Sequence, residues 1–152
     1  MKNNCAVCKR IKKIMDNSNP YFVAELETGY VVLGDYQFYR GYTIFICKEH
    51  KQELHELDVD FKVKFLKEMS VVAEAVHLAL KPHKLNYELL GNLYNHLHWH
   101  IFPRYKDDVN PSLPIWCVKE DVRCNKKYIP SEKELEKLKK KLLDKLKLIK
   151  CY

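Results

Sequence analysis

The chain has 152 residues, 47% of them hydrophobic and 31% charged, and carries a formal net charge of +7. This length suffices for one domain with a substantial core but is too short for two typical domains, so we expect a single domain over residues 1–152. No stretch approaches the roughly 18 apolar residues of a membrane span, and the first residues, Met1 to Asn4, lack the apolar core of a signal peptide. We expect a cytoplasmic protein with no membrane partner.

The predicted elements change from strand-like to helix-like patterns along the chain. A short helical or turn segment at 5–15 ends in the breaker-rich residues 16–20. Apolar residues three and four positions apart predict a long helix from an Asp58 cap to Leu80, and Pro82 ends it. Runs of β-branched and aromatic residues predict strands at 21–26, 30–33, 42–47, 86–90 and 95–102. This order predicts an α+β fold with an antiparallel sheet.

Residues 131–150 predict a basic amphipathic helix. The segment holds eight Lys against three Glu and one Asp, so it contributes about +4 to the net charge. Its apolar residues recur at steps of three and four, and Ser131 before Glu134 fits a capping box. We expect this helix to pack on the domain or at a dimer interface, with its lysines in solvent. This explains the charge better than a nucleic-acid-binding segment does. The remaining positive charge is compatible with an anionic substrate.

Three histidines alternate in the run His96-Leu97-His98-Trp99-His100. An extended strand turns alternate side chains to the same face, so the imidazoles would lie together while Leu97 and Trp99 enter the core. Imidazole titrates near neutral pH, which suits metal binding, nucleophilic attack and proton transfer. We therefore expect the function to centre on this run. A half-buried strand whose polar face happens to be histidine is the alternative interpretation.

Cys5 and Cys8 form a Cys-x-x-Cys pair near the N-terminus. The chain has six cysteines but no predicted export signal, which favours reduced thiols or metal ligation over disulfides. Two thiolates from one turn can bind zinc, but a closed tetrahedral site needs two more ligands. His50 and His96 are the natural candidates, which predicts a structural zinc site at Cys5, Cys8, His50 and His96. An ordinary or redox-active thiol pair is the alternative.

With these motifs the chain resembles the histidine-triad (HIT) family over roughly residues 20–105. The matching residues are Asp35-Tyr36-Gln37, Arg40-Gly41-Tyr42, Lys48-Glu49-His50, Glu53 to Leu57, Asn86 to Asn92 and, most specifically, His96 to Arg104. The resemblance implies a HIT-like antiparallel sheet with one long central helix and a C-terminal helix. It also implies a homodimer that binds a nucleotide, expected to be an adenine nucleotide. In the zinc-bearing members and the related galactose-1-phosphate uridylyltransferases, a Cys-x-x-Cys, a distant histidine and the first triad histidine hold zinc, which supports Zn²⁺ here.

The resemblance assigns roles to individual residues. It implies that His98, the middle histidine, attacks the α-phosphorus to give a nucleotidyl-histidine that water hydrolyses, and that His100 contacts the phosphate. Asp35 stands where family members bind the ribose hydroxyls, and Asn92 stands where many have glutamine. Asn86 is expected as a phosphate neighbour. For Asp35 and Asn86 a simple turn role is the alternative.

The expected function is therefore that of a HIT-type hydrolase or nucleotidyl transferase, similar to the diadenosine polyphosphate hydrolases. It would cleave dinucleoside polyphosphates or nucleoside phosphoramidates at the α-phosphate. One alternative is a nucleotide-binding or interaction protein without useful catalysis. Another makes His96, His98 and His100 a tripod for a metal that activates water. The sequence has no Walker loop and no Gly-x-Gly-x-x-Gly motif, so phosphate recognition is expected to come from the histidine run.

Overall fold

The computed structural model describes residues 4–150 and has an α+β fold built on one antiparallel sheet. The sheet has five strands in the order β1-β2-β3-β5-β4, and each neighbouring pair is antiparallel. The strands are β1 (Phe22–Glu25), β2 (Gly29–Leu33), β3 (Thr43–Cys47), β4 (Lys84–Leu89) and β5 (His98–Arg104). The α-helices are α1 (Ala6–Met15), α2 (Val59–Leu80), α3 (Glu120–Arg123) and α4 (Glu132–Lys150). The predicted fold class is confirmed.

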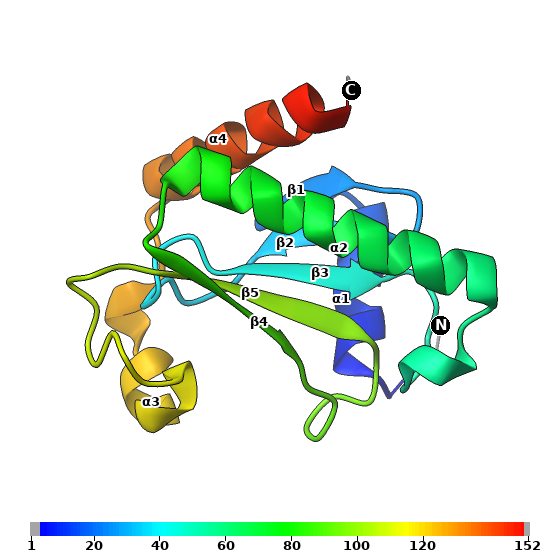
Figure 1. Cartoon of the computed structure of the whole chain (residues 1–152), viewed down its shortest axis with the longest axis horizontal. Coiled ribbons are helices and arrows are strands. Elements are labelled where there is room, and N and C mark those ends of the chain that lie inside the picture. The colour runs from blue at the N-terminus through cyan, green and yellow to red at the C-terminus, as the bar shows by residue number, and fades with distance from the viewer. Residues whose placement is uncertain (1–3, 151–152) are drawn as a thin grey trace.

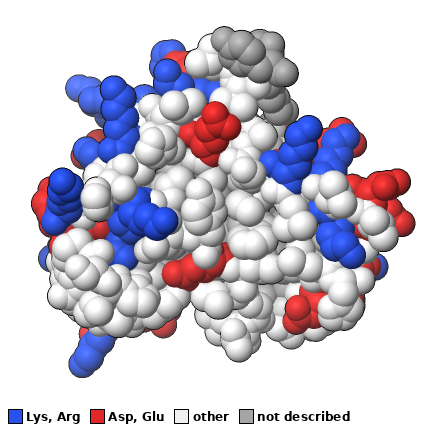
Figure 2. Space-filling model, viewed as in Figure 1, with Lys and Arg blue, Asp and Glu red and all other residues white. Residues whose placement is uncertain are grey.

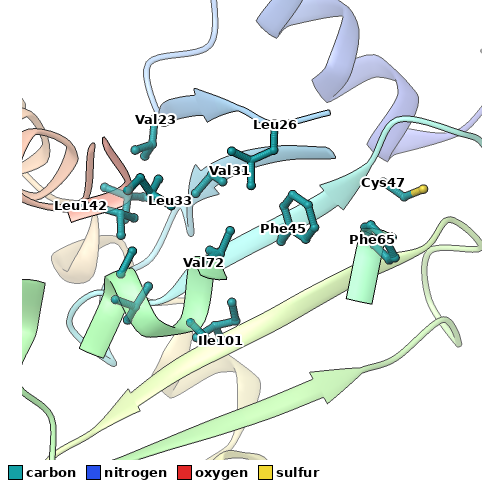
Figure 3. Packing of buried hydrophobic residues seen from close by; sticks show 14 of the residues in the cluster. Val23, Leu26, Val31, Leu33, Phe45, Cys47, Phe65, Val72, Ile101 and Leu142 are labelled. Atoms are coloured by element: carbon teal, nitrogen blue, oxygen red, sulfur yellow. The ribbon is translucent and has the colours of Figure 1, made fainter. Parts of the chain in front are cut away.

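One face of the sheet is covered by α2 and α4, with α1 on the opposite side (Figure 1). The side chain of Asp58 accepts a hydrogen bond from the Asp60 amide at the start of α2, and Lys81 ends the helix in the left-handed conformation. The rings of Phe45 and Phe65 stack with centroids 5.1 Å apart between β3 and α2. Leu142 brings α4 into the same cluster (Figure 3). Burial of these apolar side chains holds the helical layer on the sheet.

The opposite face carries α1 and the segment that follows β5. Val7, Ile11 and Ile14 of α1 are spaced to share one helical stripe, and they pack on side chains of β2 and β3. At the other side of this face, Ile115 is fully buried against Tyr39 and Phe102. Helix α1 and the segment after β5 therefore flank the middle of this face, where β3 and β5 lie side by side.

Most predicted elements occur near their expected positions, but the last strand differs. It begins at His98 rather than at residue 95 and continues to Arg104. The backbone before it turns away, because the His96 amide donates to the Tyr94 carbonyl at 2.7 Å and the Leu97 amide donates to the Lys51 carbonyl at 2.8 Å. The expectation of three histidines within one strand is therefore wrong for His96, which lies just outside β5.

The C-terminal helix α4 has the predicted capping box. The Ser131 amide donates to the Glu134 carboxylate at 2.9 Å, and the Glu134 amide donates to the Ser131 hydroxyl at 3.4 Å. Among residues 4–150, no helix combines the length and apolar character that crossing a membrane requires. The expectations for residues 1–3 and 151–152 lie outside the described part of the chain.

Candidate active site and metal cluster

A cleft of about 870 Å³ opens on the sheet face opposite α2. This volume lies within the range of ligand-binding pockets. Its floor consists of alternate side chains of the two central strands: Ile44 and Ile46 of β3, and His98, His100 and Phe102 of β5. Helix α1 forms one wall, and the segment from Trp116 to Ile129 contributes the other. The period of two in β5 thus brings the second and third histidines of the motif into one cleft.

The backbone holds His98 in one orientation. Its Nδ1 lies 2.5 Å from the carbonyl oxygen of His96, and because a carbonyl can only accept, Nδ1 carries the hydrogen. In the neutral ring the lone pair is then on Nε2. Burial lowers the pKa of His98, the bond to the His96 carbonyl opposes this, and the charge of Arg10 lowers the pKa further. A buried, oriented and neutral imidazole is suited to nucleophilic attack.

His100 is paired with the hydroxyl of Tyr42, 2.5 Å from its Nδ1. Burial raises the pKa of Tyr42, so the hydroxyl keeps its proton and donates it to Nδ1. Burial also lowers the pKa of His100 to about 3, and the neighbouring charge of His98 acts in the same direction. The hydrogen of neutral His100 is consequently on Nε2, where it can be donated to a ligand oxygen. Tyr42 was not predicted from the sequence as part of the site.

Cys5, Cys8, His50 and His96 converge beside the start of α1, with their ligand atoms within 4.8 Å of one another. Cys5 caps α1, and Cys8 follows one turn later. The Sγ of Cys8 lies 3.3 Å from Nδ1 of His50 and 3.6 Å from Nδ1 of His96. The Sγ of Cys5 lies 3.7 Å from Nδ1 of His96. All four predicted metal ligands are therefore brought together.

The ring of His96 is oriented for this cluster. Its Nε2 lies 2.9 Å from the carbonyl oxygen of Cys47 and must donate to it, which leaves the lone pair on Nδ1, among the sulfur atoms. Two thiols and two imidazoles form a donor set that can hold a metal ion. Because both nitrogens of His96 are engaged here, the alternative tripod of His96, His98 and His100 is contradicted.

The predicted substrate residues lie at different distances from the cleft. Asp35 lines it and forms an ion pair with Arg10 of α1. Asn92 is exposed in the loop between β4 and β5, and the next two residues of that loop line the cleft. Asn86 lies on β4, accepts a hydrogen bond from Arg104 at 3.0 Å and lines a separate hollow. Its side chain is thus engaged in holding Arg104.

Two further residues, Trp116 and Arg10, line the cleft. Trp116 closes one end, with its ring edge-on to His100 at a centroid distance of 6.5 Å. Arg10 lies on the helical stripe Ala6, Arg10 and Lys13, which lines the cleft next to the buried stripe of α1. The stripe is visible in the sequence at steps of four and three. Nothing in the sequence shows that it would face the histidines.

Comparison with known proteins agrees with this geometry. The family model of the HIT domain matches residues 17–107. An uncharacterized HIT-like protein of Borreliella burgdorferi is 30% identical over an alignment of 118 residues that covers 69% of this chain and 78% of that protein.

Solved histidine-triad structures share the fold. A histidine-triad nucleotide-binding protein of Sulfolobus tokodaii is 24% identical, with a TM-score of 0.72 and 94% of each chain covered. A zinc-bound histidine-triad family protein of Mycobacterium smegmatis is 21% identical, with a TM-score of 0.67 and coverage of 97% of this chain and 96% of that one. From the match to its domain model and the Borreliella relative, this chain belongs to the HIT family.

Proposed function

We propose that this protein is a nucleotide-binding hydrolase or nucleotidyl transferase that cleaves at the α-phosphate of dinucleoside polyphosphates or nucleoside phosphoramidates. The observation that carries the proposal is the orientation of His98. Its Nδ1 is held by the His96 carbonyl at 2.5 Å, while no residue of the described chain bonds its Nε2. The ring belongs to the floor of a cleft large enough for a nucleotide.

In the first step the lone pair of His98 Nε2 forms a bond to the α-phosphorus. The bond from phosphorus to the leaving group breaks, and its electron pair departs with the leaving group. A nucleoside polyphosphate leaves as an anion, whereas an amine leaving group takes up a proton from solvent. Water, or another acceptor, then forms a bond to phosphorus as the bond to His98 breaks, and the proton of the water passes to solvent. Hydrogen bonding from Nε2–H of His100 to a phosphoryl oxygen stabilises the developing charge.

Asp35 and Asn92 are proposed as substrate residues beside this centre. A carboxylate at the cleft wall suits the two hydroxyls of a ribose, and the Asp35 side chain lines the cleft and is 41% exposed. An amide such as Asn92, in a loop at the cleft mouth, suits an oxygen of the leaving group. Asn86 is proposed to contribute indirectly, through Arg104. The aromatic lining of the cleft suits the base of an adenine nucleotide.

Zinc is the proposed metal. Tetrahedral zinc, with bonds of about 2.3 Å to sulfur and 2.0 Å to nitrogen, requires about 3.5 Å between a sulfur and a nitrogen and about 3.3 Å between two nitrogens. The distances here are 3.3–3.7 Å for three of the four sulfur–nitrogen pairs and 3.2 Å between the two Nδ1 atoms. Zinc in such a closed site would be structural and would tie α1 to the segment that precedes β5. Reduced cysteine ligands also suit the proposed cytoplasmic location.

A homodimer is proposed through the exposed edge of the sheet. Strand β4 lies at that edge, and its Tyr87 side chain is 48% exposed. Val59, Val63 and Leu66 form an exposed apolar stripe on α2. Figure 2 shows this side of the molecule with charged side chains mainly toward the rim and a mostly uncharged middle. Apolar surface of this kind suits a protein partner, and light scattering at several protein concentrations would test it.

The proposed reaction is tested by rapid quenching followed by mass spectrometry. The protein is mixed with diadenosine tetraphosphate or with an adenosine phosphoramidate, quenched, and mapped under conditions that preserve phosphoramidate bonds. An adenylyl adduct on His98 is the expected result, and it would identify the substrate class. Nucleotide binding without adduct or released mononucleotide would contradict catalysis and favour the non-catalytic binding protein.

A further inference from the structure

Helix α1 brings a cationic side chain to the wall of the histidine cleft. Val7, Ile11 and Ile14 hold the helix on the sheet, and the adjacent stripe, which contains Arg10, lines the cleft. The first turn of α1 is anchored by Cys5, which caps the helix and belongs to the metal cluster. The helix therefore has little freedom to withdraw Arg10 from the cleft.

The ion pair between Arg10 and Asp35 is only partly formed. One guanidinium nitrogen, Nη2, contacts one carboxylate oxygen, Oδ2. A guanidinium offers five N–H donors, and its other donors have no partner among residues 4–150. The Oδ1 of Asp35 is shielded from solvent and also lacks a partner in the described chain. The ion pair thus leaves guanidinium donors for a ligand.

Arg10 lines the same cleft as His98, His100 and Tyr42, and the Tyr42 hydroxyl is 2.5 Å from Nδ1 of His100. The Arg10 side chain is 24% exposed, so it is partly shielded from water by its surroundings. A fork of N–H donors in a cleft that also holds a carboxylate and two imidazoles matches the oxygens of a phosphate.

We infer that Arg10 binds the phosphate of the nucleotide, while Asp35 binds its ribose hydroxyls. This inference rests on the proposed function and adds to it a guanidinium that recognises the scissile phosphate. Arg10 keeps its contact with Asp35 and donates its remaining N–H groups to non-bridging phosphoryl oxygens. The site then distinguishes a nucleoside 5′-phosphate from the nucleoside alone by the fixed positive charge of Arg10.

Calorimetric titration with AMP and with adenosine tests the inference. Arg10→Met removes the donors and keeps much of the aliphatic volume, so we expect AMP affinity to fall about 10- to 100-fold. Adenosine affinity should change less than about threefold, because no phosphate contact is lost. Arg10→Lys keeps the charge without the fork and should give an intermediate AMP affinity. Lys12→Met is the matched control, because Lys12 is exposed on the same helix and does not line the cleft.

Thermal unfolding and metal content of each variant separate a local effect from a folding defect. If Arg10→Met weakens AMP and adenosine by the same factor, Arg10 only orients Asp35 and the inference is overturned. Unchanged AMP affinity in Arg10→Met and Arg10→Lys overturns it as well, and leaves the proposed function intact. If the unmodified protein does not bind AMP in preference to adenosine, both the proposed function and the inference are overturned.

Discussion

His96 and His98 are joined by a hydrogen bond of 2.5 Å between the His96 carbonyl oxygen and Nδ1 of His98. The ring of the same His96 lies in the cluster of Cys5, Cys8 and His50 that could hold a metal ion, with Nδ1 3.6 Å from the sulfur of Cys8. One residue therefore contributes its side chain to the cluster and its backbone to the orientation of the candidate nucleophile. A change in the cluster is therefore expected to alter the orientation of His98 in the cleft through His96.

Replacing a cluster ligand should remove the metal and disturb His98. We expect Cys8→Ser to lower zinc affinity by more than about 100-fold. Losing only a residue that hydrogen-bonds to a metal ligand already lowers metal affinity roughly 10- to 100-fold. The thermal midpoint and the turnover should fall together. Zinc content by mass spectrometry and thermal unfolding check this. Cys117→Ser, at an exposed cysteine outside the cluster, is the control. An equal zinc content in both variants would contradict the predicted site.

His98→Asn should separate binding from turnover. Removal of the nucleophile is expected to lower turnover of diadenosine tetraphosphate by about 10³-fold or more, because no other group can form the covalent intermediate. AMP affinity should remain within about threefold, since the asparagine amide can still bond the His96 carbonyl. Steady-state kinetics and calorimetry give the two quantities. Residual turnover near that of the unmodified protein would rule out His98 as the nucleophile.

Tyr42→Phe removes the hydroxyl that donates to His100. Without that donor the hydrogen of His100 can move to Nδ1, which takes it away from the ligand side, and we expect kcat to fall about 10- to 100-fold. The stack of residue 42 on Phe102, at a centroid distance of 4.1 Å, should persist, so stability should change by about 1 kcal/mol. Tyr39→Phe, which loses only a long 3.4 Å bond to the Ile115 carbonyl, is the control. Equal kinetics for the two variants would contradict the role of Tyr42.

Arg104 should matter for stability. Its side chain is 4% exposed and donates to Asp108, Asn86 and the carbonyls of Leu113 and Asn110. Arg104→Met leaves the Asp108 carboxylate, 12% exposed, without its cation, and we expect unfolding free energy to fall by about 3–5 kcal/mol.

Urea unfolding measures the loss of unfolding free energy expected for Arg104→Met. In the same assay Arg40→Met, at an exposed arginine over the Tyr105 ring, should cost less than about 1 kcal/mol. A similar loss of unfolding free energy in both variants would show that the buried network around Arg104 does not add to stability.

Helix α4 should contribute to stability and not to the chemistry of the cleft. Leu146 is 2% exposed in the core shared with α2, so Leu146→Ala should lower unfolding free energy by about 2–5 kcal/mol. Leu148→Ala, at a side chain 49% exposed, should cost less than about 0.5 kcal/mol. Turnover per folded molecule should be unchanged in both, because α4 covers the face of the sheet opposite the cleft. Reduced turnover in folded Leu146→Ala would contradict this separation.

Local pattern in the sequence was sufficient to predict the helices and strands and part of the candidate site. The spacing of apolar residues from Phe61 to Leu80 predicted α2, because one helix face must be buried along its whole length. Alternation in the histidine motif predicted that His98 and His100 share a face. The donor chemistry of Cys5, Cys8, His50 and His96 predicted a cluster that the fold does assemble. Each of these three predictions depends on residue type and on spacing along the chain.

Only the tertiary structure decided how separate segments meet. Arg10 and Asp35 are 25 residues apart, and Tyr42 and His100 are 58 apart, so neither pair leaves a periodic signal in the sequence. His96 leaves the strand because the Leu97 amide bonds the carbonyl of Lys51, a partner that exists only once the chain has folded. By itself the sequence determined the family motif, the strands and helices and the chemistry available. The packing of α1 on the sheet determined which charged side chains face the histidines, because that depends on contacts between distant segments rather than on local spacing.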